Sequence, residues 1–320
     1  MCGVDSLRAT WPVIILLVVG CAQPSTGDPP PSKPAPPEVA PSSRYIVGAR
    51  RSLDVGKLSG FSSLARKPNG ELWSAPERGN VLVRLRIDGP DPGKVGSPVP
   101  LRGVPKAWDV ESMTWLDDER FAVGTETQRE GRPSDEIKFG RIEDGTARVR
   151  TAVVLPYRLW NIRARANKGI EGLCSAGRFL IAGVETVEGR DGVRFGPLGR
   201  YDMERRQWVP FRVRLTSATG KLSAVACKLA AGGASLDVFA IERHFEMSHL
   251  LRFTVPTDGS GGEIVPRVVA DLGHMLPDSP NMEGLAFRPA GGLLIIVDNN
   301  YGGIRGPTEV VLLELDEVKR

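Results

Sequence analysis

The chain has 320 residues, of which 41% are hydrophobic, 25% are charged and 6% are aromatic. This balance excludes a wholly disordered chain and a protein with many membrane spans. The 42 basic and 38 acidic residues give a net charge of +4 that no basic run concentrates, so nucleic acid is not an expected partner. Glycine and proline are abundant, at 37 and 26 residues, which favours many tight turns and therefore β structure.

Residues 1–20 have the features of an export signal. Arg8 gives a weakly basic start, residues 13–19 are apolar, and small residues precede Cys21. The apolar stretch is too short to span a bilayer. Residues 18–21 resemble a bacterial lipobox, in which the cysteine is acylated and becomes the mature N-terminus. An ordinary signal peptide followed by a chance cysteine is the alternative.

Residues 21–43 are expected to form a lipidated cysteine and an extended spacer, because eight prolines fall between Ala22 and Ser43. Ala22, which follows the cysteine, resembles the outer-membrane sorting pattern. We therefore expect an exported protein that is held at a bacterial membrane, the outer one, by lipid on Cys21. It would face the periplasm or the cell surface. Residues 44–320 form the globular part, which we expect to be a monomer.

A short segment recurs five times along the globular part. The copies begin at Phe61, Val110, Ile170, Leu222 and Met282. The second residue of each copy, called the marker below, is Ser62, Glu111, Glu171, Ser223 or Glu283. Successive markers are 49 to 60 residues apart, and a recurrence at such a period is typical of repeat architectures.

Each copy is followed by a turn and by a second apolar strand that closes on an acid. These closing acids are Glu77, Glu126, Glu185, Glu242 and Asp298. If the marker and the closing acid face each other across an antiparallel hairpin, their midpoint must fall on the turn. Four of the five midpoints carry glycine, and one is Asn69-Gly70, the strongest two-residue hairpin signal.

Two further strand-like segments follow each hairpin, for example residues 81–87 and 99–101. Four short antiparallel strands repeated about every 50 residues predict an all-β protein, a β-propeller of five four-stranded blades. Residues 45–55 precede the first repeat, and we expect them to supply the missing outer strand of the last blade. A sixth, degenerate blade within one 60-residue interval stays open. A two-sheet sandwich is the alternative fold.

Two cysteines remain in the globular part, Cys174 and Cys227. Both fall in apolar runs, so the sequence is compatible with a disulfide and with two buried thiols.

The propeller geometry predicts that the acids gather at one mouth of the central channel. The first strand of each blade lines the channel, and its start lies beside the end of the second strand. Crowded carboxylates must be neutralised, and a cluster of oxygen ligands suits Ca²⁺. The expected ligands are Glu111, Glu126, Glu171, Glu185, Glu283 and Asp298. The alternative is internal: the acids pair with nearby cations or accept backbone hydrogen bonds that fix blade packing.

Basic residues near the same mouth predict the binding of a small anionic ester. Those expected to bind the substrate are Arg78, Lys168, Lys221 and Arg243. Glu171 and Glu283 are the expected catalytic acids, and His244 could protonate the leaving group. Serine-triad, zinc and phosphate-loop motifs do not occur in the sequence.

Several short motifs resemble the family named "esterase-like activity of phytase". They are Glu-Gly-Leu at 171–173 and at 283–285, Ile-Glu-Arg at 241–243 with Phe245, and Val-Asp-Asn-Asn at 297–300. The likeness covers most of residues 57–316. It implies a propeller of exported bacterial and plant proteins, and hydrolysis of esters or phosphate esters.

The chain departs from its own pattern at Ser62 and Ser223, where the other three markers are glutamates. A metal site would therefore be lopsided and centred on the second, third and fifth blades. The alternative function is a non-catalytic propeller that binds a ligand or a protein at the cell envelope, with the acids serving the structure.

Overall fold

The structure is a computed structural model that describes residues 45–89, 91–244, 247–299 and 306–315. Contacts divide the chain into Met1–Ala35 and Pro36–Arg320, and every described residue belongs to the second unit. The predicted signal peptide, the lipidation site Cys21 and the spacer lie outside the described residues. In the described part no helix is both long enough and apolar enough to cross a membrane.

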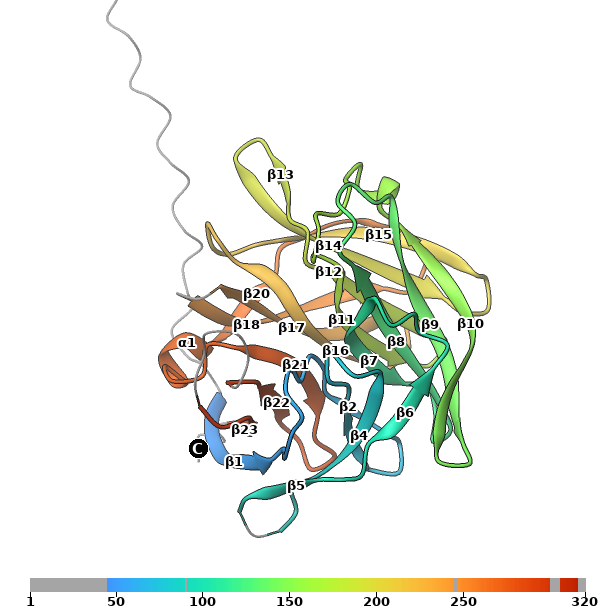
Figure 1. Cartoon of the computed structure of the whole chain (residues 1–320). Helices are drawn as coiled ribbons and strands as arrows, with labels where there is room; N and C mark the ends of the chain where they lie inside the picture. Colours follow the sequence, from blue (N-terminus) through green and yellow to red (C-terminus); the bar gives the residue numbers. More distant parts are fainter. Residues whose placement is uncertain (1–44, 90, 245–246, 300–305, 316–320) are drawn as a thin grey trace, which may run out of the picture. The chain divides into compact units, whose positions relative to one another are not determined.

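The first three blades follow one another along the chain (Figure 1). Blade 1 comprises β2 (Ala65–Arg66), β3 (Leu72–Ser74) and β4 (Val81–Arg86), and its fourth position is shared by β5 (Gly93–Val95) and β6 (Val99–Arg102). Blade 2 comprises β7 (Trp108–Trp115), β8 (Arg120–Thr127), β9 (Ser134–Glu143) and β10 (Thr146–Pro156), followed by the 3-10 turn Tyr157–Leu159. Blade 3 comprises β11 (Ile170–Ala176), β12 (Phe179–Val184), β14 (Val193–Asp202) and β15 (Gln207–Arg214), with β13 (Glu188–Arg190) beside β14.

The last two blades complete the set. Blade 4 comprises β16 (Lys221–Leu229), β17 (Ser235–His244), β18 (Met247–Pro256) and β20 (Arg267–Asp271), which runs into the short helix α1 (Leu272–Met275). Between β18 and β20, β19 (Gly262–Ile264) pairs with β15 of blade 3. Blade 5 comprises β21 (Met282–Phe287), β22 (Leu293–Val297), β23 (Glu309–Leu315) and the N-terminal strand β1 (Tyr45–Asp54).

The inner strands close a ring of five. Each of β2, β7, β11, β16 and β21 contacts the next, and β21 contacts β2 (Figure 1). Strand β1 pairs antiparallel with β23, so the start of the described chain supplies the outer strand of the last blade, as the sequence predicts. The outer strands β1 and β5, and β6 and β10, also pair in parallel and join blades 5, 1 and 2 into one sheet. The fold is a five-bladed β-propeller.

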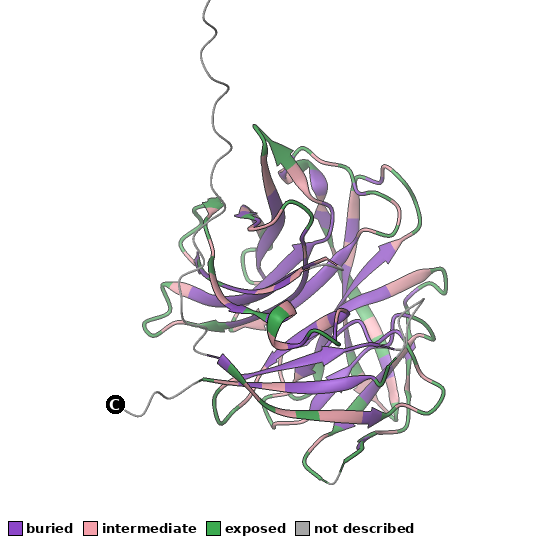
Figure 2. Ribbon diagram, turned by 90° about the vertical axis from the view of Figure 1, so that its left-hand side faces the viewer, coloured by how far each residue is buried: buried purple, intermediate pink, exposed green. Residues whose placement is uncertain are grey.

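Buried apolar side chains form five layers, one between each pair of neighbouring blades. In β22, Leu293, Ile295 and Val297 belong to the layer shared with blade 4. Leu294 and Ile296 of the same strand belong to the layer shared with blade 1. Successive side chains of a strand point to opposite faces, so one apolar run fills two layers. Figure 2 shows the buried residues along the strands and the exposed ones mainly in the loops.

Cys174 and Cys227 form a disulfide with a Cα–Cα distance of 5.8 Å. It joins β11 to β16, the inner strands of blades 3 and 4. Of the two alternatives that the sequence leaves open, the structure shows the paired one. The sequence spacing could not decide this, because the two cysteines meet only once neighbouring blades pack together.

Candidate active site

The marker residue of four inner strands lies in a β-bulge. The register breaks at Glu111 in β7, Glu171 in β11, Ser223 in β16 and Glu283 in β21. A bulged residue has no partner in the ladder. The closing acids therefore pair with residues that precede the markers: Glu126 pairs with Asp109, and Glu242 pairs with Leu222. The direct pairing of marker and closing acid that the sequence suggested is not found in these described strands.

The bulges and the strand ends assemble two groups of carboxylates that could each hold a metal ion. One group is Glu126, Glu171 and Glu185, and the other is Glu77, Asp109 and Glu111. Within each group the candidate ligand atoms all lie within 4.8 Å of one another. Blades 1, 2 and 3 supply these residues. Asp109 is absent from the sequence prediction, although it stands two residues before a marker and pairs with a closing acid.

All three members of the group of Glu126, Glu171 and Glu185 are buried. Burial is the main cause that raises the pKa of Glu171 to about 8; the carboxylates of Glu126 and Glu283 act in the same direction, whereas Lys221 and Arg243 oppose the shift. Burial also raises the pKa of Glu126 to about 7, although Arg132 and the Gly169 amide favour its charged form. The Oε2 atom of Glu126 has no hydrogen-bond partner among the described residues.

The second group is linked to the first through its charges. Burial raises the pKa of Glu111 well above its ordinary range, and the nearby Glu171, Glu126, Glu77 and Glu283 raise it further. The Oε1 atom of Glu111 is buried and has no hydrogen-bond partner in the part of the chain that the structure describes. An unpartnered buried carboxylate oxygen is costly. A cation between these groups would remove that cost.

Two closing acids serve the packing of the blades instead. Asp298 is fully buried, and its carboxylate accepts hydrogen bonds from the Phe61 amide at 2.8 Å and the Thr308 hydroxyl at 2.9 Å, which ties blade 5 to blade 1. Glu242 accepts four hydrogen bonds from Thr216 and Ser217, in the loop that leads into its own blade. Among the described residues, neither acid belongs to a carboxylate group with metal-ligand spacing.

Beside the first carboxylate group lies a basic cavity of about 420 Å³. Its lining includes Arg165, Lys168, Arg194, Lys221, Arg243 and His244. Glu185 also lines the cavity and pairs with Lys168 at 2.8 Å and with Lys221. Burial lowers the pKa of Lys221 to about 8 against the opposing effect of Glu171. Arg243 pairs with Glu283 at 2.5 Å, which neutralises this marker internally.

Four of the seven residues predicted to bind or act on the substrate, Lys168, Lys221, Arg243 and His244, share one cavity. Arg78 is exposed on blade 1 and does not line it. The predicted catalytic acids Glu171 and Glu283 are not among the residues that line it either. The sequence prediction missed Arg165 and Arg194, which precede or begin strands of blade 3 and carry no repeat signal.

A family model for phytase-like proteins, described as esterase-like activity of phytase, matches residues 55–301. The chain belongs to this family. The match confirms the resemblance found in the sequence motifs and includes every carboxylate and cation of the candidate site. Within the phytase-like domain, the serine markers Ser62 and Ser223 donate instead to carbonyls of the next blade, Val110 and Met282.

No curated protein matches this phytase-like chain. Among solved structures, it is similar to the PQQ-bound aldose sugar dehydrogenase from Streptomyces coelicolor, with 12% identity and a TM-score of 0.47 over 84% of this chain and 97% of that one. It is also similar to virginiamycin B lyase from Staphylococcus aureus, with 14% identity and a TM-score of 0.39 over 85% and 99% of the two chains.

The shifted carboxyl groups predict an unusual dependence of stability on pH in the absence of metal. The pKa of Glu171 is about 8 in the folded protein against an ordinary 4.5, so the unfolded chain releases this proton first as pH rises. The free energy of unfolding should therefore fall between about pH 5 and pH 8. Glu126 acts with the same sign up to about pH 7. Lys221, with a pKa of about 8, acts with the opposite sign, but only above that pH.

Denaturant unfolding in EDTA at several pH values measures this slope. The Glu171→Gln variant should show a flatter profile than the wild type, because it no longer carries the titrating group. An equal slope in both proteins would contradict the assignment.

Proposed function

We propose that this phytase-like propeller is a calcium-dependent hydrolase of small anionic esters, either phosphate or carboxylic esters. The observation that carries the proposal is the position of Glu185. It belongs to the buried carboxylate group and also lines the basic cavity. A cation at this group would therefore adjoin an anion in the basic cavity, an arrangement that suits metal-assisted hydrolysis of an anionic ester.

The carboxylate groups fit a hard cation. All their donors are oxygens, and Ca²⁺ accepts six to eight oxygen ligands in flexible geometry. Two of the buried oxygens, on Glu111 and Glu126, have no hydrogen-bond partner among the described residues. Glu126, Glu171 and Glu185 would hold the ion. A bound Ca²⁺ would act as a Lewis acid toward the ester and offset the negative charge that develops in the reaction.

The chain's own residues would bind the ester and move its protons. Lys168 and Arg243 line the basic cavity and would hold the anionic group. Glu171 would lose its proton when the ion binds and, as a carboxylate beside the ion, would accept the proton of an attacking water. His244 lines the same cavity and would protonate the leaving oxygen. Glu283 would act through Arg243, which it pairs with and orients.

The proposal includes export and a lipid anchor. The inter-blade disulfide supports maturation in an oxidising compartment such as the periplasm or the cell surface. Acylation of Cys21 and a spacer of residues 22–43 would hold a monomeric propeller near a bacterial outer membrane. Labelling with a radioactive fatty acid, compared between the wild type and Cys21→Ala, tests the anchor.

Initial rates with p-nitrophenyl phosphate and p-nitrophenyl acetate, in CaCl₂ and in EDTA, test the activity. We expect turnover of at least one ester that requires calcium. Lys168→Met should raise KM roughly tenfold, because it removes a cation worth about 1.4 kcal/mol of binding. Lys138→Met is the matched control, since Lys138 also pairs with a glutamate, Glu136 at 2.7 Å, but lies outside the cavity. Turnover undiminished in EDTA would contradict the metal dependence.

A second candidate is a non-catalytic propeller that binds an anionic ligand in the same basic cavity. The internal ion pairs favour it, since Glu185 and Glu283 are already paired with Lys168, Lys221 and Arg243. Absence of turnover for both esters, with no calcium effect on stability, would favour this candidate over the hydrolase.

A further inference from the structure

The end of the channel away from the acids is a separate cavity of about 440 Å³. All five inner strands reach it, through residues 64–68, 113–116, 173–175 with 177, 225–227 and 285–289. These residues follow the markers along the same strands, and each strand residue adds about 3.3 Å. No residue lines both this cavity, called the hairpin-end cavity below, and the basic cavity beside the acids.

The charge of the hairpin-end cavity is opposite to that of the acidic mouth. Arg66, Lys67 and Arg288 line it, and no aspartate or glutamate of the described residues does. Lys67 forms an ion pair with Glu71 at 3.5 Å, and Arg288 forms one with Glu314 at 3.2 Å, so the charges of both cations are balanced. The Arg66 guanidinium donates to the Gly70 carbonyl at 2.7 Å, and no ion pair of Arg66 is found among the described residues. Arg66 is therefore the cation of the lining without a direct ion pair in the described part of the chain, although Asp88 acts on its charge from a longer distance.

Two donors at this cavity have no acceptor. The Nε atom of Arg66 and the indole Nε1 of Trp115 are buried and have no hydrogen-bond partner in the described ranges. Both residues line the cavity. Buried donors are almost always satisfied in folded proteins, and an acceptor from outside the chain would satisfy these two once the Arg66 and Trp115 side chains turn toward the cavity.

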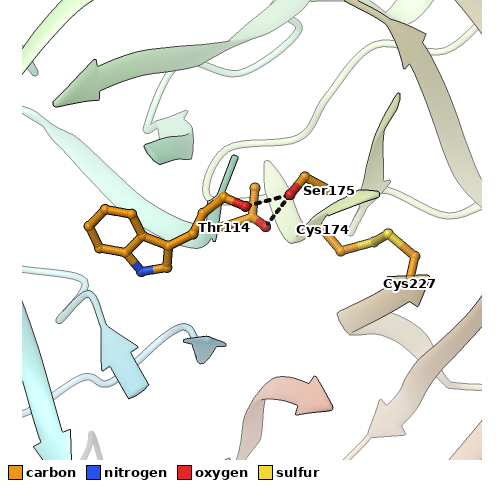
Figure 3. Close-up of a disulfide and its surroundings, with 5 residues drawn as sticks. Thr114, Cys174, Ser175 and Cys227 are labelled. Carbon is orange, nitrogen blue, oxygen red and sulfur yellow. Dashed lines mark hydrogen bonds between the residues drawn. A yellow bond between two sulfur atoms is a disulfide. The ribbon is translucent and has the colours of Figure 1, made fainter. Parts of the chain in front are cut away.

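The remaining walls are fixed and partly apolar. Lys67 lies 4.1 Å from the centre of the Trp115 ring, and Phe287 and Met113 also line the cavity. Figure 3 shows Thr114 and Ser175 turned toward each other beside the Cys174–Cys227 disulfide, with 3.2 Å between their hydroxyl oxygens. The disulfide fixes two of the five strands that form the wall.

We propose that the hairpin-end cavity is a second binding site, which takes a small organic acid with a flat or compact apolar body. Its carboxylate would accept hydrogen bonds from Arg66 and Trp115, and its apolar body would lie among Trp115, Phe287 and Met113. A monoanion fits better than a phosphate dianion, because Glu71 and Glu314 already compensate two of the three cations. This site is independent of ester hydrolysis at the other mouth.

Isothermal titration of the purified full-length protein with benzoate tests the proposal. We expect saturable binding at one site, weaker binding of acetate, and about a tenfold loss of affinity for benzoate in Arg66→Met. Because Arg66 also supports its hairpin turn, Arg288→Met serves as a second variant with an exposed side chain and should weaken binding several-fold. Arg194→Met, in the basic cavity, is the control and should bind benzoate like the wild type.

Three outcomes would overturn the proposal. The first is the absence of saturable benzoate binding. The second is unchanged affinity in both Arg66→Met and Arg288→Met. The third is loss of affinity in Arg194→Met alone, which would place the benzoate in the basic cavity. Ester hydrolysis is not the readout, so failure here leaves the proposed activity at the acidic mouth untouched.

Discussion

The Glu171→Gln substitution is expected to stabilise the protein without calcium and to destabilise it when calcium is added. Without metal the variant should be more stable than the wild type near pH 8, because a neutral amide replaces a buried carboxyl whose pKa is raised to about 8. With calcium it should be less stable, because a neutral amide, which binds the ion more weakly, replaces one of three clustered carboxylates. Calcium at 100 times its Kd stabilises the wild type by about 2.7 kcal/mol, worth several degrees of Tm.

Thermal unfolding in EDTA and in millimolar CaCl₂ measures both halves of this prediction. Glu309→Gln is the matched control, since Glu309 is equally buried at 7% exposure but belongs to neither carboxylate group. It should lose stability to the same extent in both buffers, because its partner is Arg50. If calcium raises Tm equally in the wild type and in Glu171→Gln, the metal lies elsewhere. If it raises neither, the acids are neutralised internally.

The sequence predicted the blades because strand periodicity and turn residues are local properties. The recurring hairpins gave five inner strands, and the unpaired stretch before them became β1, the outer strand of blade 5. The apolar run Leu293–Val297 needed no tertiary information, since a strand buried on both faces is apolar throughout. The β-bulges were not predicted. A bulge inserts only one residue into a strand, and in a single sequence this does not visibly change the pattern of apolar and polar residues.

The candidate site was predicted in part, and the misses have a physical reason. Repeat positions found Glu126, Glu171 and Glu185, because the repeat itself places them at one mouth. The repeat predicts the same environment for every closing acid, but the hydrogen-bond partners of each carboxylate come from loops that differ between blades. The Thr216-Ser217 loop satisfies Glu242 completely, whereas Glu126 keeps an oxygen without a partner among the described residues. Only the structure distinguishes a packing carboxylate from one available to a ligand.

This difference predicts a large and specific loss of stability in Glu242→Ala. The carboxylate is fully buried and accepts hydrogen bonds from the Thr216 amide and hydroxyl at 2.8 and 2.7 Å, and from the Ser217 amide and hydroxyl at 3.0 and 2.7 Å. Each hydrogen bond to a charged group contributes roughly 1.5–3 kcal/mol, and alanine leaves four donors and a cavity behind. We expect a loss above about 4 kcal/mol in denaturant unfolding.

Glu126→Gln is the informative comparison, because Glu126 closes the second strand of blade 2 as Glu242 closes that of blade 4. Its pKa is raised to about 7, so an uncharged amide should cost little in EDTA at neutral pH, and near pH 8 it should stabilise the protein. Glu242→Gln should still be destabilising, because an amide has one acceptor oxygen for four donors. Equal losses in Glu126→Gln and Glu242→Gln would show that both acids serve the packing of the blades. The metal site would then have lost one of its three ligands.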